Sequence, residues 1–280
     1  MGAGSLSVVG TGIQLPHITA EAQGAIEHAD KVLYLVSDPI TTRWLHHMNA
    51  SSESLAPMYH EAGHRLDAYA RIVEEVMSWV RSGHNVCLAL YGHPGVFALP
   101  GHRAIALAKE EGFAAYMLPG VSAEDCLIAD LGIDPGLTGA QNYEATDFLV
   151  HQRRWDVTAY LILWQAGTVG VLAFFPDADW SGKGARIDLL RDHLLQSYPV
   201  AHVATLYEAS PYPTVEPRVE YVELGQLLDC KFSTATTMIV PPASAPTPSE
   251  DILVKLGMRI VGDRLVVEDS QVSEFKSEQE

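Results

Sequence analysis

The sequence lacks the features that mark membrane proteins, nucleic-acid-binding proteins and disulfide-stabilised proteins. No apolar run approaches the roughly 18 uncharged residues that cross a bilayer. Lys and Arg number only 18 against 35 Asp and Glu, which gives a formal charge of −17, so nucleic acid and anionic membranes would be repelled. The chain has three cysteines, each in an apolar stretch and without metal-ligand spacing, which favours reduced thiols.

A targeting signal is also absent from the first residues. Met1-Gly2-Ala3-Gly4 has neither the basic region nor the apolar core of a signal peptide, and we expect a cytoplasmic protein. Apolar residues, in contrast, are plentiful. Of the 280 positions, 48% are hydrophobic and 19% are charged, which is typical of a compact globular protein with a large core.

Strand-like and helix-like segments alternate along the chain. Residues 6–10 are rich in β-branched side chains and stop at a glycine, residues 65–82 place apolar side chains three and four apart, and residues 85–90 predict another strand. Five such alternations by Gly120 predict an α/β fold with a parallel, helix-covered sheet. Further helices are predicted over 19–30, 102–111, 122–131 and 183–198, and further strands over 32–36, 113–118, 160–165, 202–207, 219–222 and 236–240.

Composition divides the chain into three parts. Residues 1–118 are predicted to form an N-terminal α/β lobe, and residues 119–243 a C-terminal α/β lobe in which helix is less dominant. Residues 244–280 begin with an Ala/Ser/Pro/Thr-rich linker, and residues 262–280 hold six acids and two bases. We expect this last part to be partly disordered.

Two turns follow predicted strands. Gly10-Thr11-Gly12 lacks the third glycine and the immediate helix of a dinucleotide fingerprint, so NAD binding is not favoured and a plain turn remains an alternative. Residues 91–97, Tyr-Gly-His-Pro-Gly-Val-Phe, lie at the carboxyl end of a predicted strand, where open α/β sheets bind ligands. Tyr91 and Phe97 would give apolar walls to a ring, and a purely structural turn is the alternative.

A third turn precedes the predicted helix over 122–131. Ser122 is suited to capping that helix, and the small residues beside it allow close approach of a ligand. Glu124 stands where a hydrolase nucleophile elbow requires glycine, so a catalytic serine is not favoured. We predict that this turn combines helix capping with cofactor packing.

His60-Glu61-Ala62-Gly63-His64 matches the zinc-peptidase pattern His-Glu-x-x-His. Gly63 weakens the helix that such a site needs, and no third ligand follows at a family spacing. We predict no metal, and a zinc hydrolase stays as a competing hypothesis.

Several of these segments together resemble one family. Residues 91–97, 118–135 and 236–242, with Tyr143-Glu144-Ala145 and Gln165, resemble the tetrapyrrole methylase fold of S-adenosylmethionine-dependent methyltransferases. Within it they are similar to the borosin-type peptide backbone α-N-methyltransferases, over about residues 5–260. His93 distinguishes the peptide-methylating branch from the wider family, which usually has an acidic residue at this position before the proline. The resemblance implies two α/β lobes with the cofactor in the cleft between them.

The resemblance also implies functional residues. Cofactor contacts are implied for Tyr91, His93, Val96, Phe97, Ser122, Ala123, Gln165, Tyr207, Thr236 and Thr237, with S-adenosylhomocysteine as the product. Tyr59, Arg65 and Tyr69 resemble the Tyr, Arg and Tyr that the peptide-methylating branch places over the substrate amide. Ala56 stands where that branch has a further tyrosine. The alternative for Arg65 and Tyr69 is an ordinary helical pair, since Tyr69 also fits the apolar stripe of its helix.

The chemistry of amide methylation explains these residue types. An amide nitrogen is a poor nucleophile because its lone pair is delocalised into the carbonyl. Arg65 would stabilise negative charge on the amide oxygen, and Tyr69 or Tyr59 would accept the proton directly or through water.

In fused members of this branch the substrate is the enzyme's own C-terminal tail. Here Leu265-Val266-Val267 is the only apolar trio after Val261. We therefore expect a split system, in which a separate precursor peptide with basic patches is methylated iteratively in trans by a homodimer, possibly within a heterotetramer. The alternatives are a small-molecule methyltransferase of the tetrapyrrole or diphthine type, and a binding protein without turnover.

Overall fold

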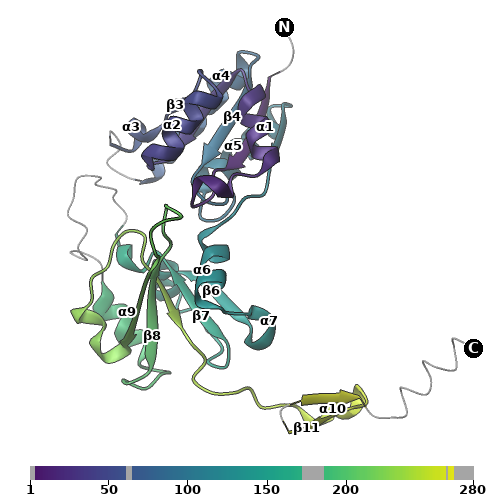
Figure 1. Cartoon of the computed structure of the whole chain (residues 1–280), viewed down its shortest axis with the longest axis vertical. Coiled ribbons are helices and arrows are strands. Elements are labelled where there is room, and N and C mark those ends of the chain that lie inside the picture. The colour runs from purple at the N-terminus through teal and green to yellow at the C-terminus, as the bar shows by residue number, and fades with distance from the viewer. Residues whose placement is uncertain (1–3, 61–64, 172–185, 263, 268–280) are drawn as a thin grey trace, which may run out of the picture.

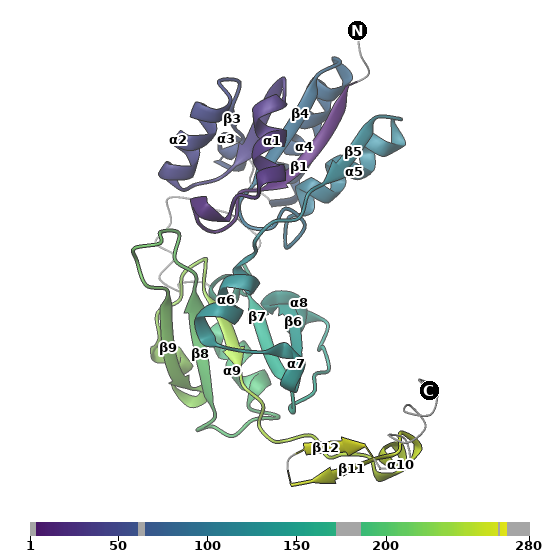
Figure 2. The ribbon, with the colours of Figure 1, turned by 45° about the vertical axis from the view of Figure 1, so that its right-hand side comes forward.

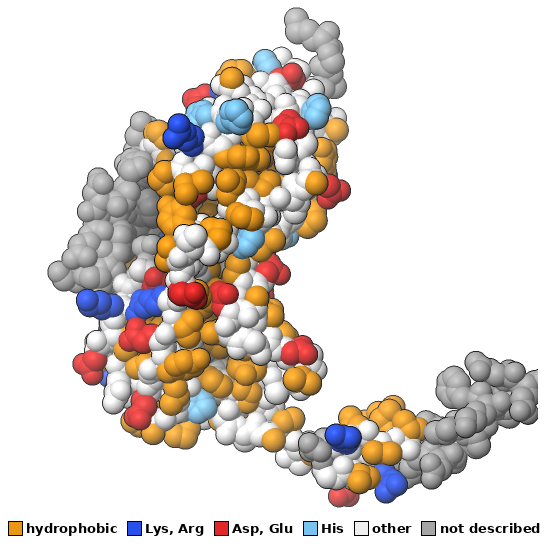
Figure 3. Space-filling model, in the orientation of Figure 1, with side chains coloured by type: hydrophobic (Ala, Val, Ile, Leu, Met, Phe, Trp, Pro, Cys, Tyr) orange, Lys and Arg blue, Asp and Glu red, His pale blue; other side chains and the backbone are white. Residues whose placement is uncertain are grey.

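The structure is a computed structural model that describes residues 4–60, 65–171, 186–262 and 264–267, with the backbone alone at Tyr59 and His60 (Figure 1). Within these residues, two five-stranded sheets form two lobes along the long axis of the molecule. A two-stranded hairpin projects from the far end of the second lobe (Figures 1, 2 and 3). In the described part of the chain, no helix combines the length and apolar character needed to cross a membrane. The expected α/β fold is confirmed.

The first sheet is entirely parallel, as the alternation of strands and helices predicts. Its strands are β1 (Ser5–Gly10), β2 (Lys31–Leu35), β3 (Glu53–Ser54), β4 (Asn85–Leu90) and β5 (Ala114–Met117), in the order β3-β2-β4-β1-β5. Strand β4 covers the predicted residues. Its alternate side chains enter two different cores: Leu88 packs with α4 and α5, whereas Cys87 and Ala89 pack with α1 and α2. Burial on both faces explains why this strand reads as a continuous apolar run.

The helices of the first lobe are α1 (Ala20–His28), α2 (Pro39–Met48), α3 (Ala56–His60), α4 (Arg65–Arg81) and α5 (Leu99–Glu110), with a 3-10 turn at Leu15–His17. Thr19 caps α1 by accepting a hydrogen bond from the N–H of Ala22, which confirms the predicted start. Helix α2 was not predicted. It begins at the Asp38 cap and buries only Thr41 and Leu45, so its apolar stripe is too narrow to be recognised from spacing.

The second sheet is mixed. Its strands are β6 (Ala140–Glu144), β7 (Tyr160–Trp164), β8 (Val203–Glu208), β9 (Arg218–Glu223) and β10 (Thr237–Val240), in the order β6-β7-β10-β8-β9. Only β6 and β7 pair in parallel, and the other neighbours are antiparallel. Its helical segments are α6 (Ala123–Leu131), α7 (Pro135–Thr138), α8 (Ala145–Val150) and α9 (Ile187–Leu194), with 3-10 turns at Ala166–Thr168 and Leu224–Asp229.

Helices cover both faces of the second sheet. On one face, α8, α9 and the turn at Leu224–Asp229 contribute to the largest core of the lobe. On the other face, Leu127 of α6 packs on Ile162, Trp164, Tyr207 and Ile239. Helix α6 therefore joins the core of the second lobe directly to the loop that enters from the first lobe (Figure 2).

The segment predicted as linker and tail contains regular structure. Helix α10 (Glu250–Lys255) is followed by an antiparallel hairpin of β11 (Met258–Val261) and β12 (Arg264–Val267). Gly262 occupies the turn with φ 65°, a conformation that favours glycine. Two short apolar runs on either side of this glycine were a hairpin signal that the composition of the segment obscured.

Two neighbouring leucines in α9 allow a direct test of the second core. Leu190 is 0% exposed and Leu189 is 46% exposed. We expect Leu190→Ala to lower the free energy of unfolding by about 3 kcal/mol, because it removes packed apolar volume and leaves a cavity. Leu189→Ala should cost less than about 1 kcal/mol. Chemical denaturation followed by circular dichroism measures both, and equal losses would contradict the assigned packing.

Candidate active site

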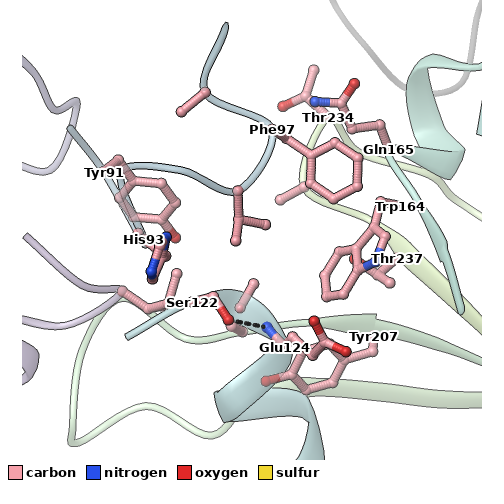
Figure 4. Close-up of a pocket in the computed structure, with 17 residues that line it drawn as sticks. Tyr91, His93, Phe97, Ser122, Glu124, Trp164, Gln165, Tyr207, Thr234 and Thr237 are labelled. Carbon is pink, nitrogen blue, oxygen red and sulfur yellow. Dashed lines mark hydrogen bonds between the residues drawn. The ribbon is translucent and has the colours of Figure 1, made fainter. Parts of the chain in front are cut away.

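A cavity of about 260 Å³ lies between the two lobes (Figure 4). It is lined by the loop after β4, the start of α6, the ends of β7 and β8, and the start of β10. The described lining residues are Ile13, Tyr91, Gly92, His93, Val96, Phe97, Ala98, Ser122, Ala123, Glu124, Trp164, Gln165, Tyr207, Ala209, Thr234, Ala235 and Thr237. We call this the interlobe cavity. It brings together nine of the ten residues implied as cofactor contacts.

The tenth, Thr236, has its side chain elsewhere. Thr236 is fully buried, its hydroxyl donates to the carboxylate of Glu208 and it accepts from the N–H of Ser233. The neighbouring Thr237, which begins β10, lines the cavity instead. The structure therefore does not bring the Thr236 side chain to the interlobe cavity.

Glycines hold the loop after β4 in place. Gly12 and Gly92 exchange two backbone hydrogen bonds of 3.2 and 3.0 Å. A Cβ on Gly10 would lie 2.3 Å from the carbonyl oxygen of Gly92, so only glycine permits this approach. The glycine turn after β1 thus supports the loop of the cavity, and Ile13 beyond it contributes to the lining.

Two lining residues have strained backbones. Among the described residues, three non-glycines have positive φ, and two of them, Phe97 (φ 51°) and Gln165 (φ 56°), line the interlobe cavity. Such conformations cost free energy and persist where the surrounding structure enforces them, commonly at functional sites. The strain was not visible in the sequence, because it depends on the packing of the two lobes.

Aromatic faces are left open to the interlobe cavity. Tyr91 and Phe97 are 46% and 49% exposed, and the Phe97 ring lies 5.9 Å from that of Trp164. Figure 4 shows the Tyr91 ring on one side of the hollow and the Phe97 and Trp164 rings on the other. Large apolar side chains that remain exposed inside a concave site favour a ligand with a flat ring. Trp164 was missed in the sequence, although its place at a strand end beside Gln165 was a usable signal.

Polar groups of the interlobe cavity are oriented by hydrogen bonds. His93 accepts a 3.0 Å bond at Nδ1 from the N–H of Gly95, which leaves Nε2 as the donor of the neutral ring. Ser122 caps α6, as predicted, and accepts from the N–H groups of Glu124 and Asp125. The Tyr207 hydroxyl donates to Asp130 over 2.6 Å. Burial, and then this hydrogen bond, raises the pKa of Tyr207, so its hydroxyl stays protonated at neutral pH.

Cysteine chemistry is not favoured near this site. Burial, and then the nearby carboxylates of Asp130 and Asp125, raise the pKa of Cys126 to about 11. A thiol with such a pKa is almost entirely protonated at neutral pH and is a weak nucleophile. All three cysteines are free, as the sequence predicts.

A second cavity, of about 340 Å³, adjoins the first. Its described lining residues are Arg65, Glu144, Thr146, Asp147, Val150, His151, Gln165, Thr168 and Val171. We call it the Arg65 cavity. Gln165 lines both cavities, so it lies at their junction. Arg65 comes from the first lobe, and the other described lining residues come from the second.

Of the three predicted catalytic residues, only Arg65 lines a cavity in the described structure. Arg65 begins α4 and Tyr69 lies one turn later, as their spacing predicts. Tyr69 is not among the described residues that line either cavity. Tyr59 lies in α3, and its side chain is outside the described residues. The sequence His60-Glu61-Ala62-Gly63-His64 also falls largely outside them. In the described part of the chain, no group of three or more His, Cys, Asp or Glu could hold a metal.

Residues 5–211 match the family model of the tetrapyrrole (corrin/porphyrin) methylases. The chain belongs to this family, as the resemblance implies. A uroporphyrin-III C-methyltransferase from Thermus thermophilus has the same fold, with a TM-score of 0.58, 18% identity, and 86% of this chain and 93% of that chain covered. A diphthine synthase matches with a TM-score of 0.57 and 16% identity over 86% of this chain and 91% of that chain.

Curated relatives match at higher identity. A methyltransferase/ribosomally synthesized type I borosin cyclic peptide precursor from Coprinopsis marcescibilis is 42% identical over 86% of this chain and 62% of its own length. The corresponding gymnopeptides precursor from Gymnopus fusipes is 40% identical over 91% of this chain and 61% of its own length. The chain thus spans about 60% of the length of these relatives, whose names combine methyltransferase and peptide precursor.

The role of Gly10 can be tested against a glycine that has open space. We expect Gly10→Ala to lower the free energy of unfolding by about 2 kcal/mol, because the new Cβ meets the Gly92 carbonyl. Gly24→Ala in α1, where nothing lies within 4 Å of the Cβ, should raise it by about 0.5–1 kcal/mol. Thermal denaturation compares the two, and a neutral Gly10→Ala would disprove the tight approach.

Proposed function

We propose that the protein transfers methyl groups from S-adenosylmethionine to backbone amide nitrogens of a peptide, repeatedly along one precursor. The observation that carries this proposal is the pair of adjoining cavities, one with aromatic walls and one with a guanidinium, which share Gln165. The names of the curated relatives, which couple a methyltransferase to a ribosomally made cyclic peptide precursor, support the same substrate class.

The interlobe cavity fits the cofactor by its chemistry. The exposed faces of Tyr91 and Phe97 suit an adenine ring, and the Nε2–H of His93 and the hydroxyl of Thr237 offer hydrogen bonds to its polar groups. Val96, Ser122, Ala123, Gln165 and Tyr207 complete the proposed contacts. When bound, S-adenosylmethionine supplies a methyl group on a sulfonium and leaves as S-adenosylhomocysteine.

The Arg65 cavity fits the reacting amide. In the described part of the chain, no residue accepts a hydrogen bond from the Arg65 guanidinium or forms an ion pair with it. A guanidinium keeps its positive charge and presents a planar set of donors, so Arg65 would bind the amide oxygen and stabilise negative charge there. Gln165 would orient the same amide from the junction of the cavities.

We assign the acceptance of the amide proton to the phenolate form of Tyr69 or Tyr59, which becomes the phenol on taking the proton directly or through water. Tyr69 follows Arg65 by one turn of α4, which places both on one side of the helix. Loss of this proton frees the nitrogen lone pair, and the charge of Arg65 favours that loss.

We propose that the peptide comes from another molecule. Helix α10 and the β11–β12 hairpin project away from the two lobes (Figures 1 and 2), and none of their described residues lines either cavity. A homodimer that methylates a separate precursor, alone or within a heterotetramer that includes the precursor, fits this arrangement. The free cysteines suit a reducing cytoplasm.

The first test is mass spectrometry of a candidate precursor peptide encoded beside this chain. Co-expression should add serial increments of about 14 Da, one methylene each, and fragmentation should place them on backbone nitrogens. The precursor expressed alone is the control. Cofactor binding without any gain on the peptide would contradict the peptide substrate and favour a small-molecule methyltransferase.

Arg65→Lys tests the assigned chemistry. The variant keeps the charge but loses the planar fork, and we expect the methylation rate to fall at least about 100-fold while the dissociation constant for S-adenosylmethionine changes less than about threefold. Isothermal titration calorimetry and timed mass spectrometry measure the two quantities. A parallel loss of binding and methylation would refute the role of Arg65.

A further inference from the structure

We propose that Glu124 makes the protein distinguish S-adenosylmethionine from S-adenosylhomocysteine by attracting the sulfonium charge. The inference rests on the proposed function, because it assumes that the interlobe cavity binds this cofactor. It concerns a residue that neither the turn pattern nor the resemblance assigns to the site.

Glu124 is the only acidic side chain among the described residues that line the interlobe cavity. The other lining residues are apolar, aromatic, hydroxyl-bearing or amide side chains, with His93 as the only imidazole. Figure 4 shows the carboxylate of Glu124 extending from the start of α6 toward Trp164 and Thr237. A single carboxylate therefore sets the charge of the cavity wall on this side.

A chain of hydrogen bonds orients this carboxylate. The indole Nε1–H of Trp164 donates to Oδ1 of Asn142 over 2.8 Å, and Nδ2 of Asn142 donates to Oε1 of Glu124 over 2.7 Å. An indole N–H can only donate, so the Asn142 oxygen must face Trp164 and its amide N–H must face Glu124. Glu124 therefore accepts this hydrogen bond at Oε1.

One oxygen of Glu124 remains available for a ligand. Oε1 is bound by Asn142, whereas Oε2 has no hydrogen-bond partner in the part of the chain that the structure describes. The same Asn142 bond holds the side chain toward the cavity, and the Ser122 cap fixes the backbone at Glu124. A carboxylate constrained in this way at a cavity wall is suited to an electrostatic contact with a cation.

The cofactor and its product differ in charge at one atom. S-adenosylmethionine carries an ammonium, a carboxylate and a sulfonium, with a net charge of about +1, whereas S-adenosylhomocysteine has a neutral thioether and a net charge of about zero. A carboxylate near the sulfur atom attracts the positive sulfonium of S-adenosylmethionine, whereas the neutral thioether of S-adenosylhomocysteine offers no charge to attract. Glu124 would therefore favour release of the product, which a protein that methylates repeatedly requires at every cycle.

The test is a set of binding measurements with the intact protein. We expect Glu124→Gln to raise the dissociation constant for S-adenosylmethionine on the order of tenfold. The dissociation constant for S-adenosylhomocysteine should change by less than about twofold. Sinefungin carries a positively charged amine at the position of the sulfonium, so its binding should weaken by about the same factor as that of the cofactor. Isothermal titration calorimetry gives all three dissociation constants without depending on turnover.

Matched variants separate charge from structure. Glu110→Gln removes the same charge from an exposed position of α5 outside the cavity, and it should leave all three constants unchanged. Glu124→Asp keeps the charge and should retain most of the preference for the cofactor. Thermal denaturation checks that each variant is folded.

The outcomes are distinct. Equal weakening of cofactor and product by Glu124→Gln would overturn the inference, because it would show a contact with a group that both ligands share. Unchanged dissociation constants for both ligands in Glu124→Gln would overturn it as well, while cofactor binding and Arg65-dependent methylation would still support the proposed function. If the unmodified protein bound neither ligand, the proposed function and the inference would both fail.

Discussion

The backbone pair between Gly12 and Gly92 is the constraint on which the interlobe cavity depends. These residues lie at the carboxyl ends of β1 and β4, and their two hydrogen bonds hold the loop that carries Tyr91, His93 and Phe97. Gly10 allows the approach because a side chain there would meet the Gly92 carbonyl. The cavity wall is thus built from backbone contacts that tolerate very little change in residue size.

The second lobe completes the cavity through strand ends. Trp164 ends β7, Tyr207 lies in β8 and Thr237 begins β10, so three neighbouring strands present side chains at one edge of the sheet. Gln165 turns away from β7 with positive φ and lies between the two cavities. A strained residue at this junction lets one sheet edge serve both the proposed cofactor site and the proposed amide site.

The fold alone does not select a substrate. The solved structures that share it include a uroporphyrin-III C-methyltransferase and a diphthine synthase, and their low identity limits the likeness to architecture. What favours a peptide here is local: an unpaired guanidinium at Arg65 in the described structure, next to a cavity with aromatic walls. The chemistry therefore depends on side chains that the two lobes bring together, each from its own core.

Local patterns in the sequence were enough to predict β4, α4, the Ser122 cap and most of the residues around the interlobe cavity, because periodicity, turn residues and a family resemblance act over short stretches. They did not reveal Glu124 or Trp164 as lining residues, the strain at Gln165, the side-chain direction of Thr236, or the α10 and hairpin segment. Those features arise from contacts between residues far apart in the chain, such as the bonds from Trp164 through Asn142 to Glu124. Sequence alone determined the class of fold and the segments that form the site, whereas the tertiary structure decided which side chains meet there, because that depends on how two separately packed sheets are placed against each other.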